Sequence, residues 1–385
     1  MTTEELVVET IGAHRGDLIA LSHFIHSHPE IGYEEYESAE AIATAAERAG
    51  MRVERAIAGL PTAFRATTGS GSLHVALCAE FDALPDVGHA CGHNIIGASS
   101  LGAALALSAV AGELDLTVAL LGTPAEEGGG GKIDLIDAGY FDEVDVAMMI
   151  HPWPEDRLEA QCLAVEQFDV TFTGKEAHAS AAPWEGANAL DALTIAQVAL
   201  GLLRQQLRPG DQVHGIVAEG GSAANIIASR TVGRFMARST TSERLSVLRR
   251  RVNDCFSAGA LASGTSMRMD EIGHPFSDMS SDAQVLAHFR HAAEALGRSY
   301  DLDDARVARP TISTDMANVS HVVPSIHPLW AIPTNGAVNH QPEFTAACAT
   351  AEADQAVVEG ATALALTVVG VARDVELRQR LERNQ

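Results

Sequence analysis

The sequence lacks most of the features that mark secreted, membrane-bound or nucleic-acid-binding proteins. Its 385 residues include five cysteines, an odd number without any Cys-x-x-Cys pair, which argues against a disulfide framework and against a zinc ribbon. Basic residues are few, since 26 lysines and arginines face 51 aspartates and glutamates and give a formal net charge of −25. Because this charge repels phosphate backbones and anionic lipid headgroups, we expect neither a nucleic-acid partner nor a membrane partner.

A targeting segment is not indicated either. The first residues lack the basic start and apolar core of a secretory signal, and Thr2 and Glu5 instead have the spacing of a helix capping box. The uncharged run at 95–112 approaches membrane length, but its alanines, glycines and serines favour a buried helix. We therefore expect a cytoplasmic protein.

Strand-like and helical segments alternate through the first 150 residues. The apolar runs typical of strands lie at 73–79, 116–121 and 144–150. The helical segments between them predict an α/β fold with a mainly parallel sheet. The polar clusters that follow these runs are Glu80/Asp82, Glu126/Glu127 and His151. Because ligands of such sheets bind beyond the carboxyl ends of the strands, we expect the clusters to form one site.

The pattern changes between residues 166 and 278. Segments with strand, helix, strand, strand, helix and strand patterns follow one another, which is the βαββαβ order of a ferredoxin-like fold. The α/β character returns afterwards and ends in a long amphipathic helix. We therefore predict a catalytic domain formed by residues 1–165 and 279–385, with an inserted ferredoxin-like domain at 166–278.

The densest group of potential metal ligands is the glycine-rich run at 88–94. Cys91 and His93 are residue types that bind zinc, and the flanking glycines let the backbone bend around an ion. A glycine-rich turn with a buried thiol is the alternative interpretation. Since a metal ion needs about four ligands, further ligands have to come from distant segments.

A second cluster contains the adjacent carboxylates Glu126 and Glu127, followed by four glycines and a lysine. Adjacent carboxylates repel each other unless a cation lies near, and one could bind a metal while the other acts as a base. An acidic loop end is the alternative. The run is not a P-loop, because Glu126 stands where that motif has glycine and Ile133 where it has serine or threonine. A serine nucleophile elbow is also missing, since residues 97–101 lack its second glycine.

Together these motifs resemble the zinc exopeptidases of the aminoacylase, carboxypeptidase G and auxin-conjugate hydrolase type, peptidase family M20. The matching motifs are His28-Pro29-Glu30, Asp82-Ala83-Leu84-Pro85, the runs 89–94 and 124–132, His151-Pro152, Ala177-His178, Asn225 and the His-x-Pro-x-Phe segment 340–344. They extend over nearly the whole chain. Within the family, the chain looks most similar to the p-aminobenzoyl-glutamate hydrolase and β-alanyl-lysine dipeptidase branch, through Asn94 and the segments 79–82, 183–186 and 314–321.

The resemblance implies a metal centre. Two divalent cations per subunit would be held by Cys91, His93, Glu127, His151 and His340. Zinc is the favoured ion, while manganese and cobalt suit the same kinds of ligand.

The resemblance also implies catalytic and substrate-binding roles. Glu126 would be the general base, Asp82 would orient a metal ligand, and His178 would reach the scissile carbonyl, often across a homodimer. Asn225 and Arg238 would contact the substrate carboxylate. The inserted domain would therefore serve as a lid and dimerisation domain.

The implied activity is hydrolysis of an amide bond by metal-activated water and a glutamate base. The substrate would be a small molecule with a free carboxylate, such as an N-acyl amino acid, an aminobenzoyl-glutamate or a dipeptide. The chain departs from many relatives at two positions, where Glu80 stands in place of histidine and Cys91 in place of a bridging aspartate. It departs from the auxin-conjugate relatives at a third, where Asn94 stands in place of aspartate. We therefore expect a second metal site that is weaker or takes a different ion.

Two other functions use the same residues. A non-catalytic metal- or ligand-binding protein of this fold would have no use for Glu126 beside Glu127. A cysteine amidase would use Cys91 as nucleophile and His93 or His151 as base. A chelator should inactivate a metal enzyme and spare a cysteine enzyme.

Overall fold

The computed structural model describes residues 1–159, 161–300 and 312–382. The remaining residues of the predicted catalytic domain, 160, 301–311 and 383–385, lie outside the described part. The chain divides into two compact units. Unit 1 falls within Met1–Gln161, Met279–Arg309 and Thr314–Gln385, and unit 2 within Cys162–Asp278 and Pro310–Ser313.

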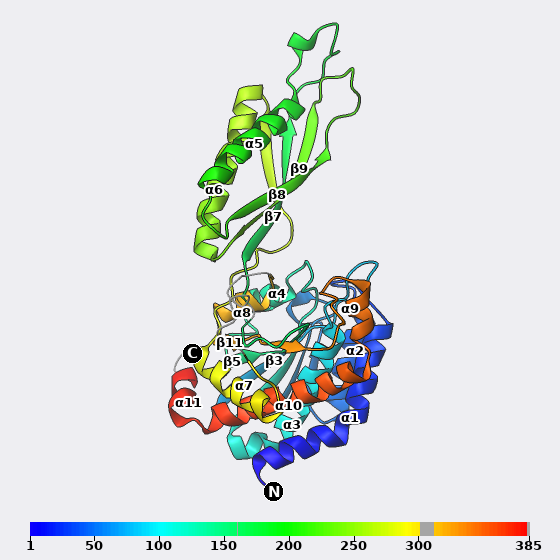
Figure 1. The fold of residues 1–385 in the computed structure, drawn as a ribbon, viewed down its shortest axis with the longest axis vertical. Helices are drawn as coiled ribbons and strands as arrows, with labels where there is room; N and C mark the ends of the chain where they lie inside the picture. The colour runs from blue at the N-terminus through cyan, green and yellow to red at the C-terminus, as the bar shows by residue number, and fades with distance from the viewer. Residues whose placement is uncertain (160, 301–311, 383–385) are drawn as a thin grey trace. The chain divides into compact units, whose positions relative to one another are not determined.

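Unit 1 is built on a mixed, mainly parallel sheet, which confirms the predicted α/β class (Figure 1). Its strands, in spatial order, are β1 (Arg52–Arg55), β2 (Phe64–Gly69), β4 (Leu116–Gly122), β3 (Leu73–Ala79), β5 (Val146–Met148) and β11 (Ser325–Ile326). The last four are parallel, whereas β1 and β2 pair antiparallel at one edge. A separate parallel pair joins β6 (His151–Trp153) to β12 (Leu329–Ala331).

Helices cover this sheet. They are α1 (Thr3–Ser27), α2 (Tyr36–Arg48), η1 (Ile57–Gly59), α3 (His93–Leu114), α4 (Gly131–Asp137), α7 (Ala283–Ala295), α8 (Met316–Ser320), α9 (Pro342–Ala347), α10 (Ala351–Arg373) and α11 (Val375–Leu381). The capping box predicted from Thr2 and Glu5 is present at the start of α1. The hydroxyl of Thr2 accepts a hydrogen bond from the backbone N–H of Glu5, and the carboxylate of Glu5 accepts one from the backbone N–H of Thr2. Both N–H groups would otherwise lack a partner at the start of the helix.

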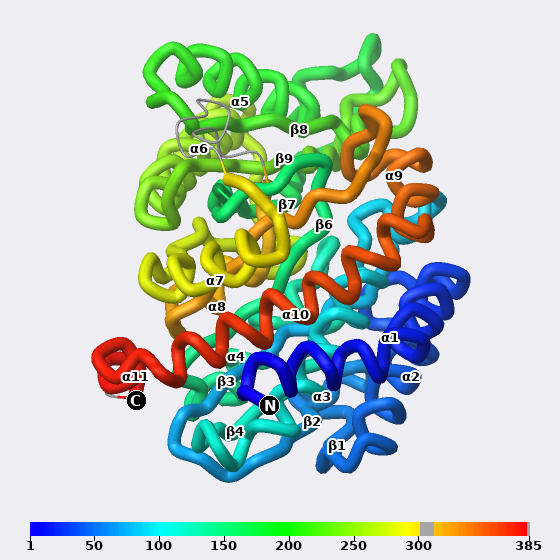
Figure 2. Tube along the Cα trace, turned by 60° about the horizontal axis from the view of Figure 1, so that its bottom comes forward, coloured from blue at the N-terminus to red at the C-terminus, as the bar shows by residue number. Residues whose placement is uncertain are grey.

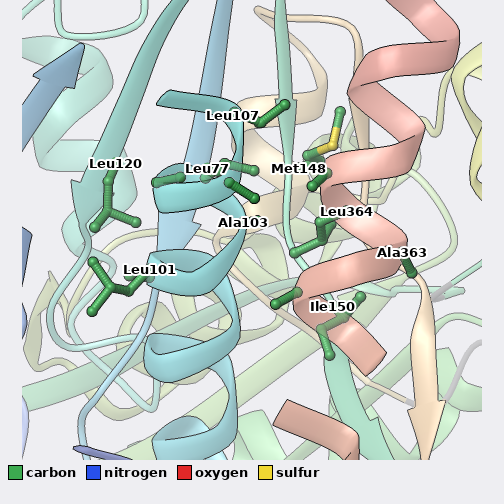
Figure 3. Packing of buried hydrophobic residues seen from close by; sticks show 14 of the residues in the cluster. Leu77, Leu101, Ala103, Leu107, Leu120, Met148, Ile150, Ala363 and Leu364 are labelled. Atoms are coloured by element: carbon green, nitrogen blue, oxygen red, sulfur yellow. The ribbon is translucent and has the colours of Figure 1, made fainter. Parts of the chain in front are cut away.

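The centre of unit 1 is the small-residue helix α3, with α1 and α10 running beside it (Figure 2). A side chain at Gly102 would come within 3 Å of Leu18 on α1 and Ala361 on α10, so glycine lets the three helices approach closely. Leu101 and Leu107 of α3 and Leu364 of α10 lie in one apolar cluster with side chains from the strands (Figure 3). The prediction of a buried helix at 95–112 is confirmed.

Two described helices, α3 and α10, have the length and apolar composition that could cross a membrane. Both are mostly buried inside unit 1, where their apolar side chains form the core. Their hydrophobicity is therefore explained by packing within the fold.

Unit 2 has its own antiparallel sheet and its own core. Its elements are β7 (Ala164–Thr173), η2 (Pro183–Glu185), α5 (Ala189–Leu203), η3 (Arg204–Gln206), β8 (Gln212–Glu219), β9 (Arg230–Ser239), α6 (Ser242–Ser263) and β10 (Ser266–Glu271). The strand order is β10-β7-β9-β8, and α5 and α6 pack on the sheet. Phe168, Phe235 and Phe256 form an aromatic cluster in this core. The boundary predicted at residue 166 falls inside β7.

Candidate active site

The carboxyl ends of neighbouring parallel strands bring the predicted polar clusters together. The last residue of β3, Ala79, pairs with the last residue of β4, Gly122, so the segments that follow both strands leave the sheet at the same edge. Glu80 and Asp82 follow β3, whereas Glu126 follows β4. All three side chains are buried, with exposed fractions of 0%, 1% and 7%. The expectation that polar residues gather beyond the strand ends is therefore met for these segments.

The glycine-rich run bends sharply between Cys91 and His93. Gly92 has φ of 77°, and a side chain there would come within 2.8 Å of Pro152. Only glycine fits this left-handed, crowded position. His93 then becomes the first residue of α3, and both flanking side chains are buried.

All five predicted metal ligands occur in overlapping groups of side chains that could hold an ion. In each group, one ligand atom per residue lies within 4.8 Å of the others. The groups are Cys91/His93/His151, Cys91/Glu127/His340, His93/Glu126/Glu127 and Glu80/Glu126/Asp315. Segments as distant as residues 91 and 340 thus converge at one place in unit 1.

Asp82 orients two neighbours of this site. Its Oδ1 atom lies 2.8 Å from Nδ1 of His93, and its Oδ2 atom accepts a hydrogen bond of 2.9 Å from the backbone N–H of Glu127. The other ring nitrogen of His93 is buried without a hydrogen-bond partner among the described residues. It lies 3.9 Å from a carboxylate oxygen of Glu126 and 4.0 Å from one of Glu127. A carboxylate behind a histidine whose second nitrogen is free is the usual arrangement around a metal ion.

The charges around His93 also fit a cation. Burial lowers the pKa of His93, but Asp82, Glu80 and Glu127 outweigh it and raise this pKa well above its usual value. Burial, Glu80 and Glu127 raise the pKa of Glu126 well above its usual value. Because so many buried carboxylates repel one another, a cation bound among them would stabilise the ionised forms.

Cys91 does not have the surroundings of a catalytic thiol. Burial, followed by the charge of Glu127, raises the pKa of Cys91 well above its usual value. Nucleophilic cysteines need a lowered pKa, which a nearby cation or helix N-terminus provides. Without a bound metal ion the site therefore disfavours the thiolate, which argues against the cysteine-amidase alternative.

The two predicted histidine ligands from later segments, His151 and His340, have backbone contacts. Nδ1 of His151 lies 2.8 Å from the carbonyl oxygen of Pro152, which leaves Nε2 available. His340 has φ of 70°, and its backbone N–H donates to the carbonyl of Ala90. Its Nε2 atom lies 3.7 Å from Glu127, while the side chain is 63% exposed. The side chain of His340 is therefore the most exposed of the five predicted ligands.

Four buried groups near the site were not predicted to take part: Glu35, Lys132, Asp315 and His327. His327 follows β11, and its ring centroid lies 5.4 Å from that of His151. Neither of its ring nitrogens has a hydrogen-bond partner among the described residues. The strand before it has only two residues, one of them a serine, so no apolar run in the sequence could have identified it.

Glu35 holds the backbone immediately before the general-base candidate. Ala125 has φ of 59°, and its N–H donates a hydrogen bond of 2.8 Å to Oε1 of Glu35. Glu35 is fully buried. Burial, followed by the charge of Asp82, raises the pKa of Glu35 to about 7 from an ordinary value of 4.5.

Replacing Glu35 by Gln should reduce the pH dependence of stability. A carboxyl group whose pKa is higher in the folded than in the unfolded protein makes its full contribution to the stability of the fold below pH 4.5. This contribution is lost as the pH rises to about 7. The loss amounts to roughly 3 kcal/mol at most. Denaturant unfolding at pH 5 and pH 8, with chelator present, should show a smaller difference for Glu35→Gln than for wild type. The control is exposed Glu34→Gln, and parallel curves for all three proteins would contradict this assignment.

Unit 2 contains the remaining predicted residues. His178 and Asn225 lie in adjacent loops, since the N–H of Ala179 donates to the carbonyl of Asn225. Arg238 lies on β9, eight residues beyond Arg230, or about 27 Å along an extended strand. Unit 2 thus brings His178 and Asn225 together, whereas Arg238 lies near the last residue of β9, far from Arg230 at its start. The Arg238 guanidinium donates to the hydroxyl of Ser313.

Comparison with known proteins identifies the family. The model of Peptidase family M20/M25/M40 matches residues 76–368 of the chain. The chain belongs to this family. The chain is 40% identical over 366 residues to the Xaa-Arg dipeptidase of Mus musculus, with 91% of this chain and 85% of that protein covered. It is 33% identical over 251 residues to one of the subunits of the p-aminobenzoyl-glutamate hydrolase of Escherichia coli, with 60% and 52% covered.

Solved structures of M20 relatives share the fold. An aminobenzoyl-glutamate utilization protein from Klebsiella pneumoniae aligns with a TM-score of 0.73 at 20% identity, covering 93% of this chain and 97% of that one. The YXEP protein of Bacillus subtilis, described as a dinuclear metal-binding peptidase, aligns with a TM-score of 0.71 at 21% identity, covering 93% and 99%. The sequence-based recognition of the M20 family is confirmed, and the chain is a hydrolase that acts on amide bonds.

Proposed function

We propose that this M20 hydrolase is a metal-dependent dipeptidase that releases a C-terminal amino acid, with a basic residue as the preferred product. The observation that carries the metal-dependent mechanism is the convergence of Cys91, His93, Glu127, His151 and His340 in overlapping groups, one of which contains the unpaired ring nitrogen of His93. The preference for a basic product is supported by two relatives of high coverage, the mouse and human Xaa-Arg dipeptidases. A net charge of −25 also favours the approach of cationic substrates.

Two divalent cations would be held by these five side chains. The thiolate, imidazole and carboxylate ligands favour zinc, and manganese or cobalt would also be accepted. The description of the Bacillus subtilis neighbour as dinuclear supports the number two. When bound, the cations would lower the pKa of a water molecule toward about 7 and polarise the scissile carbonyl.

Glu126 would move the proton. Its buried carboxylate belongs to the same group as His93 and Glu127, so it lies within reach of a water molecule held there. It would accept a proton from this water as the new C–O bond forms at the carbonyl carbon. It would then pass the proton to the amine nitrogen as the C–N bond breaks. Asp82 would keep the His93 ring in place throughout.

His178 would donate a hydrogen bond to the carbonyl oxygen. Its Nδ1 atom accepts hydrogen bonds from the backbone N–H groups of Ser180 and Ala181, at 3.3 and 3.2 Å. Because Nδ1 acts as an acceptor, the proton of the neutral ring is on Nε2, which is then a donor. Asn225 in the adjacent loop would bind the substrate carboxylate. Arg238 could contact the same carboxylate only from a different subunit, given its distance along β9.

Unit 2 would also form the interface of a homodimer, as a ferredoxin-like lid and dimerisation domain. Strand β8 is an edge strand of the sheet, and Ile216 and Val217 on it are 63% and 46% exposed. Helix α5 adds the exposed apolar side chains Val198 and Leu202. An unprotected apolar edge strand favours pairing with a second copy, and a twofold axis would join β8 to β8.

One mixing experiment tests both the dimer and His178. His178→Ala should lower kcat by about 10²–10³-fold through the loss of an oxyanion donor. If His178 acts across the dimer, mixing His178→Ala with Glu126→Gln should restore about a quarter of native activity, because half of the dimers would hold one complete site. Full activity of His178→Ala would remove this residue from the mechanism. The cross-dimer arrangement would be contradicted if the protein sedimented as a monomer. It would also be contradicted if the mixed variants exchanged subunits without regaining activity.

A panel of amides tests the substrate proposal. We expect metal-dependent release of arginine or lysine from dipeptides at a higher kcat/KM than hydrolysis of p-aminobenzoyl-glutamate or N-acetyl amino acids. A preference for p-aminobenzoyl-glutamate would overturn the substrate but not the hydrolase. Hydrolysis that survives complete removal of metal would overturn the mechanism.

We also place the protein in the cytoplasm. Cys78, Cys91, Cys255 and Cys348 are free thiols and three of them are buried, as expected for a protein in a reducing compartment. Fractionation of cells that express the chain would test this, and recovery outside the cytoplasmic fraction would contradict it.

A further inference from the structure

A fully buried lysine lies directly behind the proposed base. Lys132 is the second residue of α4, and its side chain has no exposed surface. Its Nζ atom lies 2.5 Å from Oε1 of Glu80 and 2.6 Å from Oδ1 of Asp315. Burial lowers the pKa of Lys132, but Asp315, Glu80 and Glu126 outweigh it and raise this pKa above its usual value. The ammonium group is therefore charged.

Lysine is rare in this chain, which makes its presence here informative. The sequence contains two lysines, Lys132 and Lys175, among 26 basic residues. Arginine supplies every other positive side chain. A compact ammonium can lie between two carboxylates in a closed space, whereas a planar guanidinium needs more room. The use of lysine at 132 thus fits a requirement for a small point charge.

The surroundings of this ammonium look like a cation site. Glu80, Glu126 and Asp315 form a group of three carboxylates in which one oxygen atom of each lies within 4.8 Å of the others. Three carboxylates in this arrangement would suit a divalent ion. However, Nζ of Lys132 already contacts two of the three. The chain itself supplies the positive charge that this group requires.

Lys132 joins the segments that carry the site. Its backbone N–H donates a hydrogen bond of 3.0 Å to Oδ2 of Asp315, the residue just before α8. The main chain and the side chain of Lys132 therefore both bind the Asp315 carboxylate. Its ammonium reaches Glu80 at the end of β3. It also ends the loop that begins with Glu126 and Glu127, whose other end is held by Glu35 through Ala125. Both ends of the loop are therefore fixed by buried polar contacts.

Glu80 lies between Lys132 and the proposed metal ligand His93. One carboxylate oxygen binds Lys132, and the other lies 3.5 Å from Nε2 of His93 without a hydrogen-bond partner among the described residues. Glu80 thus supplies the nearest of the three carboxylate charges beside this ring nitrogen. Loss of the ammonium would leave Glu80 and Asp315 as buried, unpaired charges.

We propose that the Lys132 ammonium is a tethered cation that positions the loop carrying Glu126 and Glu127, and that Glu80 and Asp315 hold this ammonium, close to Glu126, in place of a third metal ion. Lys132 is a positioning residue, because it contacts neither the substrate nor the proposed ligands. The role in turnover rests on the proposed hydrolytic function.

Chemical rescue tests this proposal. Lys132→Ala should lower the unfolding temperature and reduce kcat on the order of 10²-fold, with a smaller change in KM, because a displaced base costs turnover. Added propylammonium chloride should raise both the unfolding temperature and kcat. Tetramethylammonium chloride at the same concentration should raise neither, because it carries charge but no N–H donor. The matched control is Lys175→Ala, an exposed lysine, which should show no response to amine.

A second variant covers the case in which Lys132→Ala does not fold. The triple variant Glu80→Gln/Lys132→Met/Asp315→Asn removes all three charges with little change in volume, so it should fold. Its kcat should be low, and neither its kcat nor its unfolding temperature should change when propylammonium is added. Native kcat in Lys132→Ala or in the triple variant would overturn the proposal. So would equal responses to propylammonium and tetramethylammonium, or metal bound between Glu80 and Asp315 in the wild type.

The outcome is separable from that of the proposed function. Wild-type hydrolysis and metal content are measured in the same experiment. If the wild type hydrolyses no amide, the proposed function fails. The amine-dependent unfolding temperature of Lys132→Ala then still decides whether the ammonium is a tethered cation.

Discussion

Replacing Glu126 by Gln is expected to lower kcat by about 10²–10⁴-fold while the metal content stays native. The substitution keeps the size of the side chain but removes the carboxylate that accepts the proton from water. Glu126 lies in one group with His93 and Glu127, so its carboxylate is close to the ligands without being needed as one of the five. Turnover on an Xaa-Arg dipeptide and metal analysis of the same sample provide the measurement.

The adjacent residue is the matched control. Glu127→Gln should lose metal as well as activity, because Glu127 shares a group with Cys91 and His340 and its N–H is held by Asp82. Excess metal should restore part of the activity of Glu127→Gln and none of that of Glu126→Gln. If the two variants behave identically in metal content and rescue, the division of roles between the two carboxylates is wrong.

Replacing Cys91 by Ser is expected to reduce metal content and to lower kcat/KM by at least about 10²-fold, with partial recovery in excess zinc or manganese. A serine hydroxyl is a much poorer ligand for these ions than a thiolate. The thiol belongs to two of the overlapping ligand groups, so its loss affects both sides of the site. Metal analysis and kinetics with added ions provide the measurement.

This variant also separates the metal enzyme from a cysteine amidase. A nucleophilic Cys91 would give a Ser variant with unchanged metal content and no recovery in excess metal. Cys255→Ser, at a partly exposed thiol in unit 2, is the control for general effects of losing a cysteine and should remain native. Native metal content in Cys91→Ser would remove this residue from the ligand set.

Much of the fold could be predicted because apolar runs and helical periodicity are local features of the sequence. The parallel sheet and the buried helix were of this kind, and both are present. The convergence of the polar clusters could also be predicted, since neighbouring parallel strands end at one edge. The strand predicted at 144–150 is shorter in the structure, where β5 spans Val146–Met148 and a second strand, β6, begins at His151.

The supporting residues could not be predicted in the same way. Glu35 and Asp315 become partners of Ala125 and Lys132 only through tertiary packing, across separations of 90 and 183 residues. No spacing rule connects such pairs. Lys132 did have a sequence signal, the scarcity of lysine, although the glycines before it suggested only a comparison with P-loops. The left-handed backbone conformation of His340 is likewise not indicated by any local pattern.

Anomalous X-ray scattering from crystals grown with zinc or manganese would test the metal centre most directly. We predict anomalous peaks in contact with Cys91, His93, Glu127, His151 and His340, and none between Glu80 and Asp315. Peaks that avoid those five side chains, or a fully metal-loaded active enzyme with no peak beside His93, would contradict the mechanism.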